Sequence, residues 1–221
     1  MSKRPGFIRS LPFGLYIGVM VLDPLLRPLL PGQFDERWLY GVRVALVLGA
    51  LTVLWRSYTE LTDPTSAKAS DWVWGVGAGV AVFVLWVVLD VEPFAFPAEG
   101  GFDPRSGGSV DLRFAAMRLA GATLVVPVME ELFWRSFILR WLQRPAFLSV
   151  NPRTVGLRAL IFSSVLFATE HRLWLAGLLA GLAYGWLYKR SGNLWVPILA
   201  HALTNGLLGA YVLATGSWSF W

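Results

Sequence analysis

The sequence predicts an all-α, polytopic transmembrane helical bundle of about seven membrane helices, with eight as the upper count. Three observations support this class. Hydrophobic residues make up 56% of the 221 residues and charged residues only 15%, whereas a typical soluble domain has about 25% charged residues. The apolar residues come in blocks of about 20, the length that spans a bilayer core of ~30 Å. The 12 Trp residues fit the aromatic belts found at membrane interfaces.

Apolar segments divide the chain into its predicted spans. Their expected bounds are Leu11–Leu30, Trp38–Trp55, Trp72–Val91, Leu112–Leu142, Thr154–His171, Leu173–Tyr188 and Leu194–Ala214. The first segment is followed by Asp23-Pro24 rather than by a small-residue cleavage site, so we expect a retained span and not a signal peptide. No internal repeat is evident, and we expect a single integral-membrane domain over residues 1–221.

The charges of the connections alternate along the chain and predict an orientation. An excess of Lys and Arg occurs before the first segment and in two later connections, at Lys3, Arg4 and Arg9, then Arg140, Arg144, Arg153 and Arg158, then Lys189 and Arg190. The loop Glu92–Asp111 is acidic, with Glu92, Glu99, Asp103 and Asp111 against Arg105. Because Lys and Arg mark the cytoplasmic side, we expect a cytoplasmic N-terminus and an external C-terminus. The net charge of +5 then reflects membrane orientation, and no nucleic-acid partner is expected.

Two adjacent carboxylates, Glu130 and Glu131, lie inside the apolar segment Leu112–Leu142. A charged group in hydrocarbon costs at least ~2.5–3.5 kcal/mol, so such residues tend to be functional. Glu131 and Arg135 are four residues apart on one helical face, which predicts an ion pair. Glu130 lies about 100° around the helix from Glu131. It is therefore the freer carboxylate, which suits a general base or acid.

Both histidines of the chain lie in or at the ends of later apolar segments. His171 follows Phe167 by four residues, and His201 precedes Asn205 by four, so the second pair shares one helical face. Counted from the predicted inner boundary at 1.5 Å per residue, Glu130, His171, His201 and Asn205 lie about 12–20 Å deep. That depth is near the middle of the bilayer. The turn at His171 is then expected below the outer surface, where irregular backbone is tolerated inside protein or beside a wet cavity.

The residue types favour hydrolysis by activated water without a cofactor. The chain has no cysteine, which excludes a thiolate nucleophile, and it lacks the His-Glu-x-x-His zinc motif and the Gly-x-Ser-x-Gly elbow. In the scheme that remains, Glu130 and His171 hold a water and deprotonate it as it attacks a scissile carbonyl. His201 and Asn205 donate hydrogen bonds to the developing oxyanion. No resident metal is expected in this scheme.

Two other functions fit the same residues. Two His and one Glu can form a catalytic zinc site, so a divalent metal is one alternative. Intramembrane acids also mark ion pathways, and polar side chains hold membrane helices together, so a non-proteolytic transporter, proton relay or scaffold is the other. The remaining charged residues near segment ends are interpreted as anchors or helix pairings, namely Asp23, Arg27, Arg43 and Arg118.

The spaced motifs resemble the CPBP (Abi) family of intramembrane proteases, which includes the CAAX-prenyl endoproteases. The family pattern Glu-Glu-x-x-x-Arg, Phe-x-x-x-His and His-x-x-x-Asn occurs here in order, as Glu130-Glu131…Arg135, Phe167…His171 and His201…Asn205. The resemblance implies a glutamate-type endopeptidase with Glu130 as base and His171 assisting. It also implies that His201 and Asn205 form the oxyanion site, with supporting roles for Glu131 and Arg135; Phe167 is expected to pack against the site.

A second likeness narrows the family to a bacterial branch. The tail from Asn193 to Gly209 and the loop Phe102-Asp103-Pro104 look like CAAX-protease-related proteins associated with exosortase protein-sorting systems. This likeness implies the inner membrane of a Gram-negative bacterium and a functional link to an exosortase system. The substrate implied is a membrane-embedded or membrane-anchored protein or peptide. The loop Glu92–Asp111 is expected outside the hydrocarbon, either as a spacer or as a cap over the site.

Overall fold

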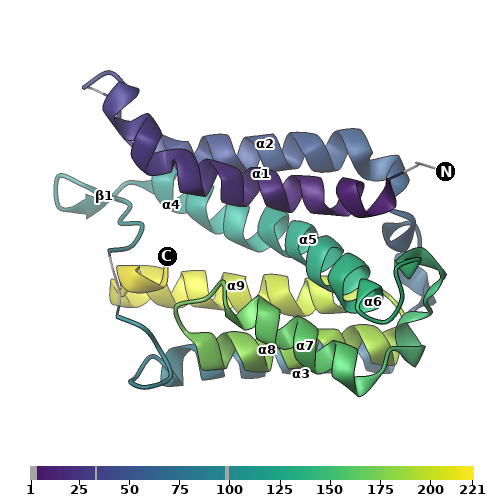
Figure 1. The fold of residues 1–221 in the computed structure, drawn as a ribbon. Coiled ribbons are helices and arrows are strands. Elements are labelled where there is room, and N and C mark those ends of the chain that lie inside the picture. The colour runs from purple at the N-terminus through teal and green to yellow at the C-terminus, as the bar shows by residue number, and fades with distance from the viewer. Residues whose placement is uncertain (1–3, 33, 98–99) are drawn as a thin grey trace.

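The computed structural model describes residues 4–32, 34–97 and 100–221. Lys3 and Glu99, which entered the charge count, lie outside these residues. The described ranges form an all-α bundle of 7 helices, of which 5 are long and apolar enough to cross a membrane. The predicted fold class is confirmed. Figure 1 shows the helices side by side along one direction, with the N- and C-termini at opposite ends of the bundle.

The first three helices lie close to their predicted bounds. Helix α1 spans Pro5–Leu26 and continues into the 3-10 turn η1, Arg27–Leu29. Its start at Pro5 precedes the predicted Leu11, because proline suits the first turn of a helix. Helices α2 and α3 span Trp38–Leu54 and Ala69–Val88. Three 3-10 turns connect them: η2, Trp55–Ser57; η3, Thr59–Leu61; and η4, Pro64–Ser66.

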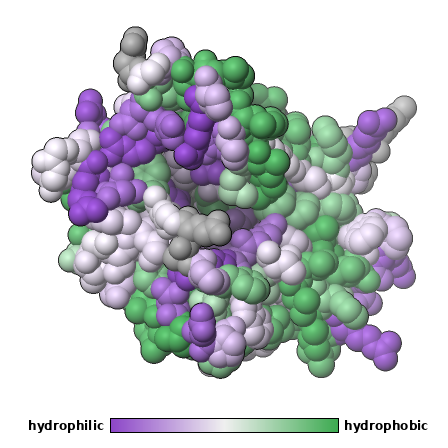
Figure 2. Space-filling view, turned by 60° about the vertical axis from the view of Figure 1, so that its left-hand side comes forward, coloured by the Kyte–Doolittle hydropathy of each residue, from purple (hydrophilic) through white to green (hydrophobic). Residues whose placement is uncertain are grey.

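A short β-hairpin lies in the loop after α3, where the sequence predicts no strand. Strands β1, Arg105–Ser106, and β2, Ser109–Val110, pair antiparallel. Gly107 and Gly108 form the two-residue turn between them with φ of 59° and 86°. Only glycine adopts two such angles readily, which is why this sequence makes a tight hairpin. Figure 2 shows hydrophilic side chains gathered at this end of the molecule and hydrophobic side chains along its flank.

One long helix, Leu112–Trp141, carries both glutamates of the candidate site. It consists of α4, Leu112–Ala120; the π-helical η5, Gly121–Val125; α5, Val126–Glu131; the π-helical η6, Leu132–Ile138; and α6, Leu139–Trp141. The widened turn η5 has a local cause, because Pro127 cannot donate to the ladder and its ring crowds the carbonyl four residues earlier. Turns of this kind occur often at functional sites, and here they flank α5 on both sides.

The last three helices complete the bundle. They are α7, Leu157–Ala168; α8, Trp174–Ser191; and α9, Trp195–Thr215, with the short 3-10 turns η7, Phe147–Ser149; η8, Pro152–Thr154; and η9, Trp218–Phe220. Helix α9 packs on α3 and α8, and α7 packs on α8. Half of the apolar window of α9 is buried inside the bundle, against 11% for α1. Helix α9 is therefore a central helix, and its inward side chains can face the long helix.

Candidate functional site

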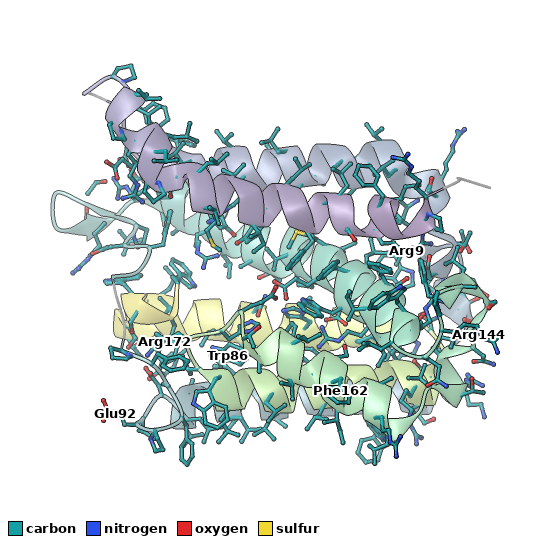
Figure 3. All side chains as sticks on the ribbon, in the orientation of Figure 1. Arg9, Trp86, Glu92, Arg144, Phe162 and Arg172 are labelled. Carbon is teal, nitrogen blue, oxygen red and sulfur yellow. The ribbon has the colours of Figure 1, made fainter. Side chains whose placement is uncertain are left out.

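The four predicted catalytic residues line one cavity. This cavity, of about 280 Å³, lies between α5, α9 and the turn after α7, and it is lined by Glu130, His171, His201 and Asn205. Phe167 also lines it. Figure 3 shows Trp86, another lining residue, among the side chains that fill the space between the helices. Residues far apart in sequence are thus brought together, whereas their individual roles remain predictions.

Glu131 is the paired carboxylate of the two. Its Oε1 lies 3.1 Å from Nη1 of Arg135, the contact that the four-residue spacing predicts. The same oxygen accepts a hydrogen bond from Nδ1 of His201 at 3.0 Å. The Arg135 guanidinium also lies 4.3 Å from the ring centre of Phe167 and 5.3 Å from that of Tyr184, in cation–π contact. These contacts make Glu131 a group that orients His201.

Glu130 is the freer carboxylate. Its Oε2 is buried and has no hydrogen-bond partner among the described residues. The Nε2 atom of His201 lies 4.0 Å from this oxygen, which is too far for a direct hydrogen bond and suits a bridging water. A buried carboxylate oxygen normally has a partner. The unpaired oxygen of Glu130 lies at the cavity, where a reactant could supply the missing hydrogen bond.

The hydrogen bonds of the histidines determine which ring nitrogen is free. Nδ1 of His171 lies 2.9 Å from the carbonyl oxygen of Phe167. A carbonyl only accepts, so Nδ1 carries the proton and neutral His171 has a bare Nε2 that can accept one. His201 donates from Nδ1 to the Glu131 carboxylate. Its Nε2 therefore carries a hydrogen only when the ring is doubly protonated.

These bonds limit the predicted oxyanion site. Neutral His201 has no Nε2–H to donate while Nδ1–H is bound to Glu131, so its predicted role requires an imidazolium. The amide nitrogen of Asn205 donates one hydrogen to the backbone oxygen of Ala122 at 2.8 Å. An amide nitrogen has two hydrogens. Asn205 therefore retains one donor for a ligand in the cavity.

The cavity is also lined by residues that are absent from the predicted site, among them Glu170, Tyr184 and Trp86. Glu170 accepts a hydrogen bond from Nε1 of Trp134 at 3.0 Å. The Tyr184 ring stacks on His201 at 5.1 Å, and Trp86 meets His171 edge-on at 5.1 Å. The position of Glu170 next to His171 in the sequence could have indicated it. The two aromatic residues lie in apolar helices, where nothing separates them from ordinary packing residues.

The positions of the acidic and histidine side chains can be compared with what a divalent-metal site requires. Among residues 4–32, 34–97 and 100–221, no group of three or more His, Cys, Asp or Glu side chains is placed to hold a metal ion. His201 approaches Glu130 and Glu131 through different ring nitrogens. A metal site needs donor atoms that converge on one point, so His201 could share a metal ion with only one of these two carboxylates.

Comparison with known proteins agrees with the predicted resemblance at a coarse level. The model of the family described as Type II CAAX prenyl endopeptidase Rce1-like matches residues 112–207. Comparison with curated proteins and with solved structures gave no match. The matched region covers less than half of the chain but contains all the predicted site residues. The chain is thus similar to this family over its site-bearing helices, which supports a CAAX-type intramembrane protease activity in general terms.

Proposed function

We propose that the chain is a glutamate-type intramembrane endopeptidase that hydrolyses a peptide bond of a membrane-embedded or membrane-anchored substrate. The observation that carries this proposal is that Oε2 of Glu130 has no hydrogen-bond partner among the described residues and lies beside a cavity that both histidines also line. A structural carboxylate would be expected to have its oxygens hydrogen-bonded. The similarity of residues 112–207 to CAAX prenyl endopeptidases supports the reaction class.

In the proposed mechanism, a water bound beside Glu130 and His171 is the nucleophile. Glu130 takes one proton from this water, and the bare Nε2 of His171 accepts a hydrogen bond from it. The oxygen attacks the scissile carbonyl carbon, and the oxyanion receives hydrogen bonds from Asn205 and from imidazolium Nε2–H of His201. The proton held by Glu130 then passes to the leaving nitrogen. The C–N bond breaks to give an acid and an amine, and the mechanism needs no cofactor.

The cellular setting is part of the proposal. We place the chain in the bacterial inner membrane as a single domain, with a cytoplasmic N-terminus, a periplasmic C-terminus and a functional link to an exosortase system. The charge pattern supports the orientation, since Arg9 and Arg144 lie at one end of the bundle and Glu92 at the other (Figure 3). The lipid bilayer is the expected surrounding, and no nucleic-acid partner is proposed.

The test compares the N- and C-termini of membrane proteins in cells with wild-type protein and with Glu130→Gln. Glu92→Gln is the matched control, because Glu92 is an exposed acid outside the cavity. We expect processed termini in wild-type and Glu92→Gln cells that are absent in Glu130→Gln cells. Identical termini in all three strains would remove the proposal, and full cellular function of Glu130→Gln would favour a scaffold.

A second arm addresses the metal alternative. The purified protein is assayed on a substrate found by the first arm, with and without a strong chelator. Activity that persists in chelator supports hydrolysis by Glu130-activated water. Activity that is lost and then restored by added zinc would favour the divalent-metal alternative instead.

A further inference from the structure

The catalytic cavity extends along one face of the long helix. Four of its lining residues are spaced four apart on this helix: Arg118, Ala122, Val126 and Glu130. Residues at this spacing share one helical face, so the cavity runs lengthwise from Glu130 to Arg118. At 1.5 Å per residue the two positions are about 18 Å apart. Helix α9 lines the same space with His201, Thr204, Asn205 and Leu208.

Arg118 is a cation that forms no ion pair with any carboxylate in the described part of the chain. Its Nη1 donates to the hydroxyl of Tyr40 at 3.0 Å, and its guanidinium lies 4.6 Å from the Tyr40 ring centre. Arg113 on the same helix, by contrast, pairs with Asp111 at 2.7 Å. In the described part of the chain, neither Nε nor Nη2 of Arg118 makes a hydrogen bond. These two groups form the edge of the guanidinium that can bind a carboxylate in bidentate fashion.

A second cation reinforces this end of the cavity. The Arg43 guanidinium lies 4.4 Å from the ring centre of Tyr16 and 5.1 Å from that of Tyr40. Its Nε is buried with no hydrogen-bond partner among the described residues. Tyr16 itself lines the cavity. Arg43 and Arg118 therefore flank Tyr40, and no described carboxylate forms an ion pair with either.

The predicted role of Arg118, as an anchor or a helix pairing, explains only part of this geometry. Pairing between α2 and α4 accounts for the Tyr40 contact. An anchor, however, would extend its charged end to the membrane interface, whereas Arg118 lines the catalytic cavity. A cation without an acidic partner in a cavity, away from the carboxylate that acts as base, suits recognition of an anionic group on a ligand.

We propose that Arg118, reinforced by Arg43, is a carboxylate-binding subsite that selects substrates with an acidic group about five residues from the scissile bond. The position of that bond rests on the proposed function of Glu130. An extended peptide advances 3.3–3.6 Å per residue, so about 18 Å corresponds to about five residues. The carboxylate is either a free C-terminus or the side chain of an Asp or Glu residue.

Binding can be measured without catalysis. The probes are an N-acetylated apolar pentapeptide with a free C-terminal carboxylate and the same peptide as a carboxamide. Both are titrated into the full-length Glu130→Gln protein in detergent micelles, and Trp fluorescence reports binding because Trp86 and Trp221 line the cavity. We expect the acid to bind about 10- to 100-fold more tightly, the range for hydrogen bonds to a charged group.

Variants test whether Arg118 causes the preference for the acid over the carboxamide. In the same background, Arg118→Gln is expected to bind acid and amide equally, and Arg118→Lys to retain part of the preference. Arg113→Gln is the matched control, since Arg113 lies on α4 outside the cavity and its side chain is 74% exposed; it is expected to retain the full preference. Equal binding of acid and amide by the protein with intact Arg118 overturns the subsite, whether or not Arg118→Gln folds.

A third pair of probes separates the two sources of the carboxylate. These are carboxamide pentapeptides with Asp or Asn at the last position. Tight binding of the Asp peptide means that an acidic side chain is sufficient. Preference for the free acid alone means that the subsite recognises a chain terminus. If neither acidic probe binds more tightly than its neutral counterpart, the proposed subsite is ruled out.

The kinetic arm distinguishes failure of the subsite from failure of the proposed function. On a substrate cleaved in a Glu130-dependent manner, Arg118→Gln should raise KM about 10- to 100-fold with little change in kcat, as expected when binding alone is lost. Reversing both charges, with Arg118→Glu and a Lys in place of the substrate acid, should restore cleavage. Cleavage without acid preference removes the subsite and leaves the protease. If the protein binds the acidic probes preferentially but shows no Glu130-dependent cleavage, the subsite is kept and the protease function is removed.

Discussion

Two buried clusters of charged residues, each with members on the long helix, differ in how completely their polar atoms are hydrogen-bonded. The Glu60 network consists of Arg9, Glu60, Ser136 and Arg140, and the candidate-site cluster consists of Glu130, Glu131, Arg135 and His201. The two clusters are adjacent, because Arg135 and Ser136 are consecutive residues that belong to different clusters. Both are largely shielded from solvent, with the side chains of Glu60 and Glu130 7% and 12% exposed, so solvent exposure does not explain their difference in hydrogen bonding.

The Glu60 network is complete. Arg9 donates to the two carboxylate oxygens of Glu60 at 2.7 and 2.6 Å, and Arg140 donates at 2.7 Å. The Ser136 hydroxyl also donates to this carboxylate. Arg9 also donates hydrogen bonds to the backbone oxygens of Pro5 and Ser57. This network joins α1, the α2–α3 connection and the end of the long helix, and its complete bonding is typical of a structural role.

The hydrogen bonding of the candidate-site cluster is incomplete. Oε2 of Glu130, Oε2 of Glu131 and both Nη atoms of Arg135 are buried without a hydrogen-bond partner in the described residues. Arg135 approaches Glu131 to 3.1 Å, but the contact lacks hydrogen-bond alignment. Buried polar atoms without partners are costly. In the described residues the fold leaves these atoms without partners close to a cavity, whereas no buried polar side-chain atom of the neighbouring Glu60 network lacks one.

The largest expected effect separates the two clusters by activity. Glu130→Gln should lower kcat by about 10³-fold or more, because a positioned base contributes about 10²–10⁴-fold. The free energy of unfolding should not fall, since the substitution removes a buried charge that has no hydrogen-bond partner. Turnover and thermal unfolding of the purified protein check both parts. An unfolded Glu130→Gln protein would show that this carboxylate is structural.

The next effect is on stability alone. Glu60→Gln leaves Arg9 and Arg140 without their buried counter-charge, which should cost about 3–5 kcal/mol of unfolding free energy. The folded fraction should keep its kcat, because Glu60 does not line the catalytic cavity. Glu36→Gln is the control: the Glu36–Arg27 pair is half exposed on both sides, and such pairs contribute about 0–1 kcal/mol. A large loss of kcat in folded Glu60→Gln would end the distinction between the clusters.

The sequence predicts the helices well because membrane spans are set by local composition. Apolar block length locates the helices to within a few residues, except that α1 begins at Pro5 instead of Leu11, and 5 of the described helices are long and apolar enough to cross a membrane. The i, i+4 spacing predicts the Glu131–Arg135 contact. The four predicted residues line one cavity, in agreement with the similar depths counted for them along their helices, and their catalytic roles stay predictions. The hairpin at Gly107-Gly108 is not predicted, because each of its strands has only 2 residues and shows no alternating pattern, although two consecutive glycines are a turn signal.

Periodicity cannot predict partners that are far apart in the sequence. Arg9 and Arg140 enter the charge count as separate cytoplasmic markers, and Glu60 takes no part in it. The structure joins them across 51 and 80 residues. The same limit applies to the Asn205–Ala122 bond, which spans 83 residues. These bonds decide which donor atoms remain free, and no local pattern contains that information.

The third effect is an acid titration of the Glu60 network. Burial tends to raise the pKa of Glu60, but hydrogen bonds from Arg9 and Ser136 and the charges of Arg9 and Arg140 lower it from 4.5 to about 2. A carboxyl with a lowered folded pKa stabilises the fold above its unfolded pKa and loses this contribution as pH falls to the folded value. We therefore expect about 3 kcal/mol of stability to be lost between about pH 4.5 and 2. Thermal unfolding against pH should show this step, and Glu60→Gln should lack it. An unchanged step in Glu60→Gln would assign it to another carboxyl.

The smallest of these effects concerns Asn205, which combines features of both clusters. One amide hydrogen is bound to Ala122 and the other is free for the cavity. Loss of a single oxyanion donor costs about 10²-fold in kcat, or about 2.7 kcal/mol, so Asn205→Ala should lower kcat by this factor. Asn193→Ala is the control, because the buried Asn193 amide binds Asp63 and Ser66 away from the cavity; it should lower stability and leave kcat unchanged. If Asn205→Ala behaves like Asn193→Ala, the amide is a helix-packing group and the oxyanion must be stabilised by His201 without it.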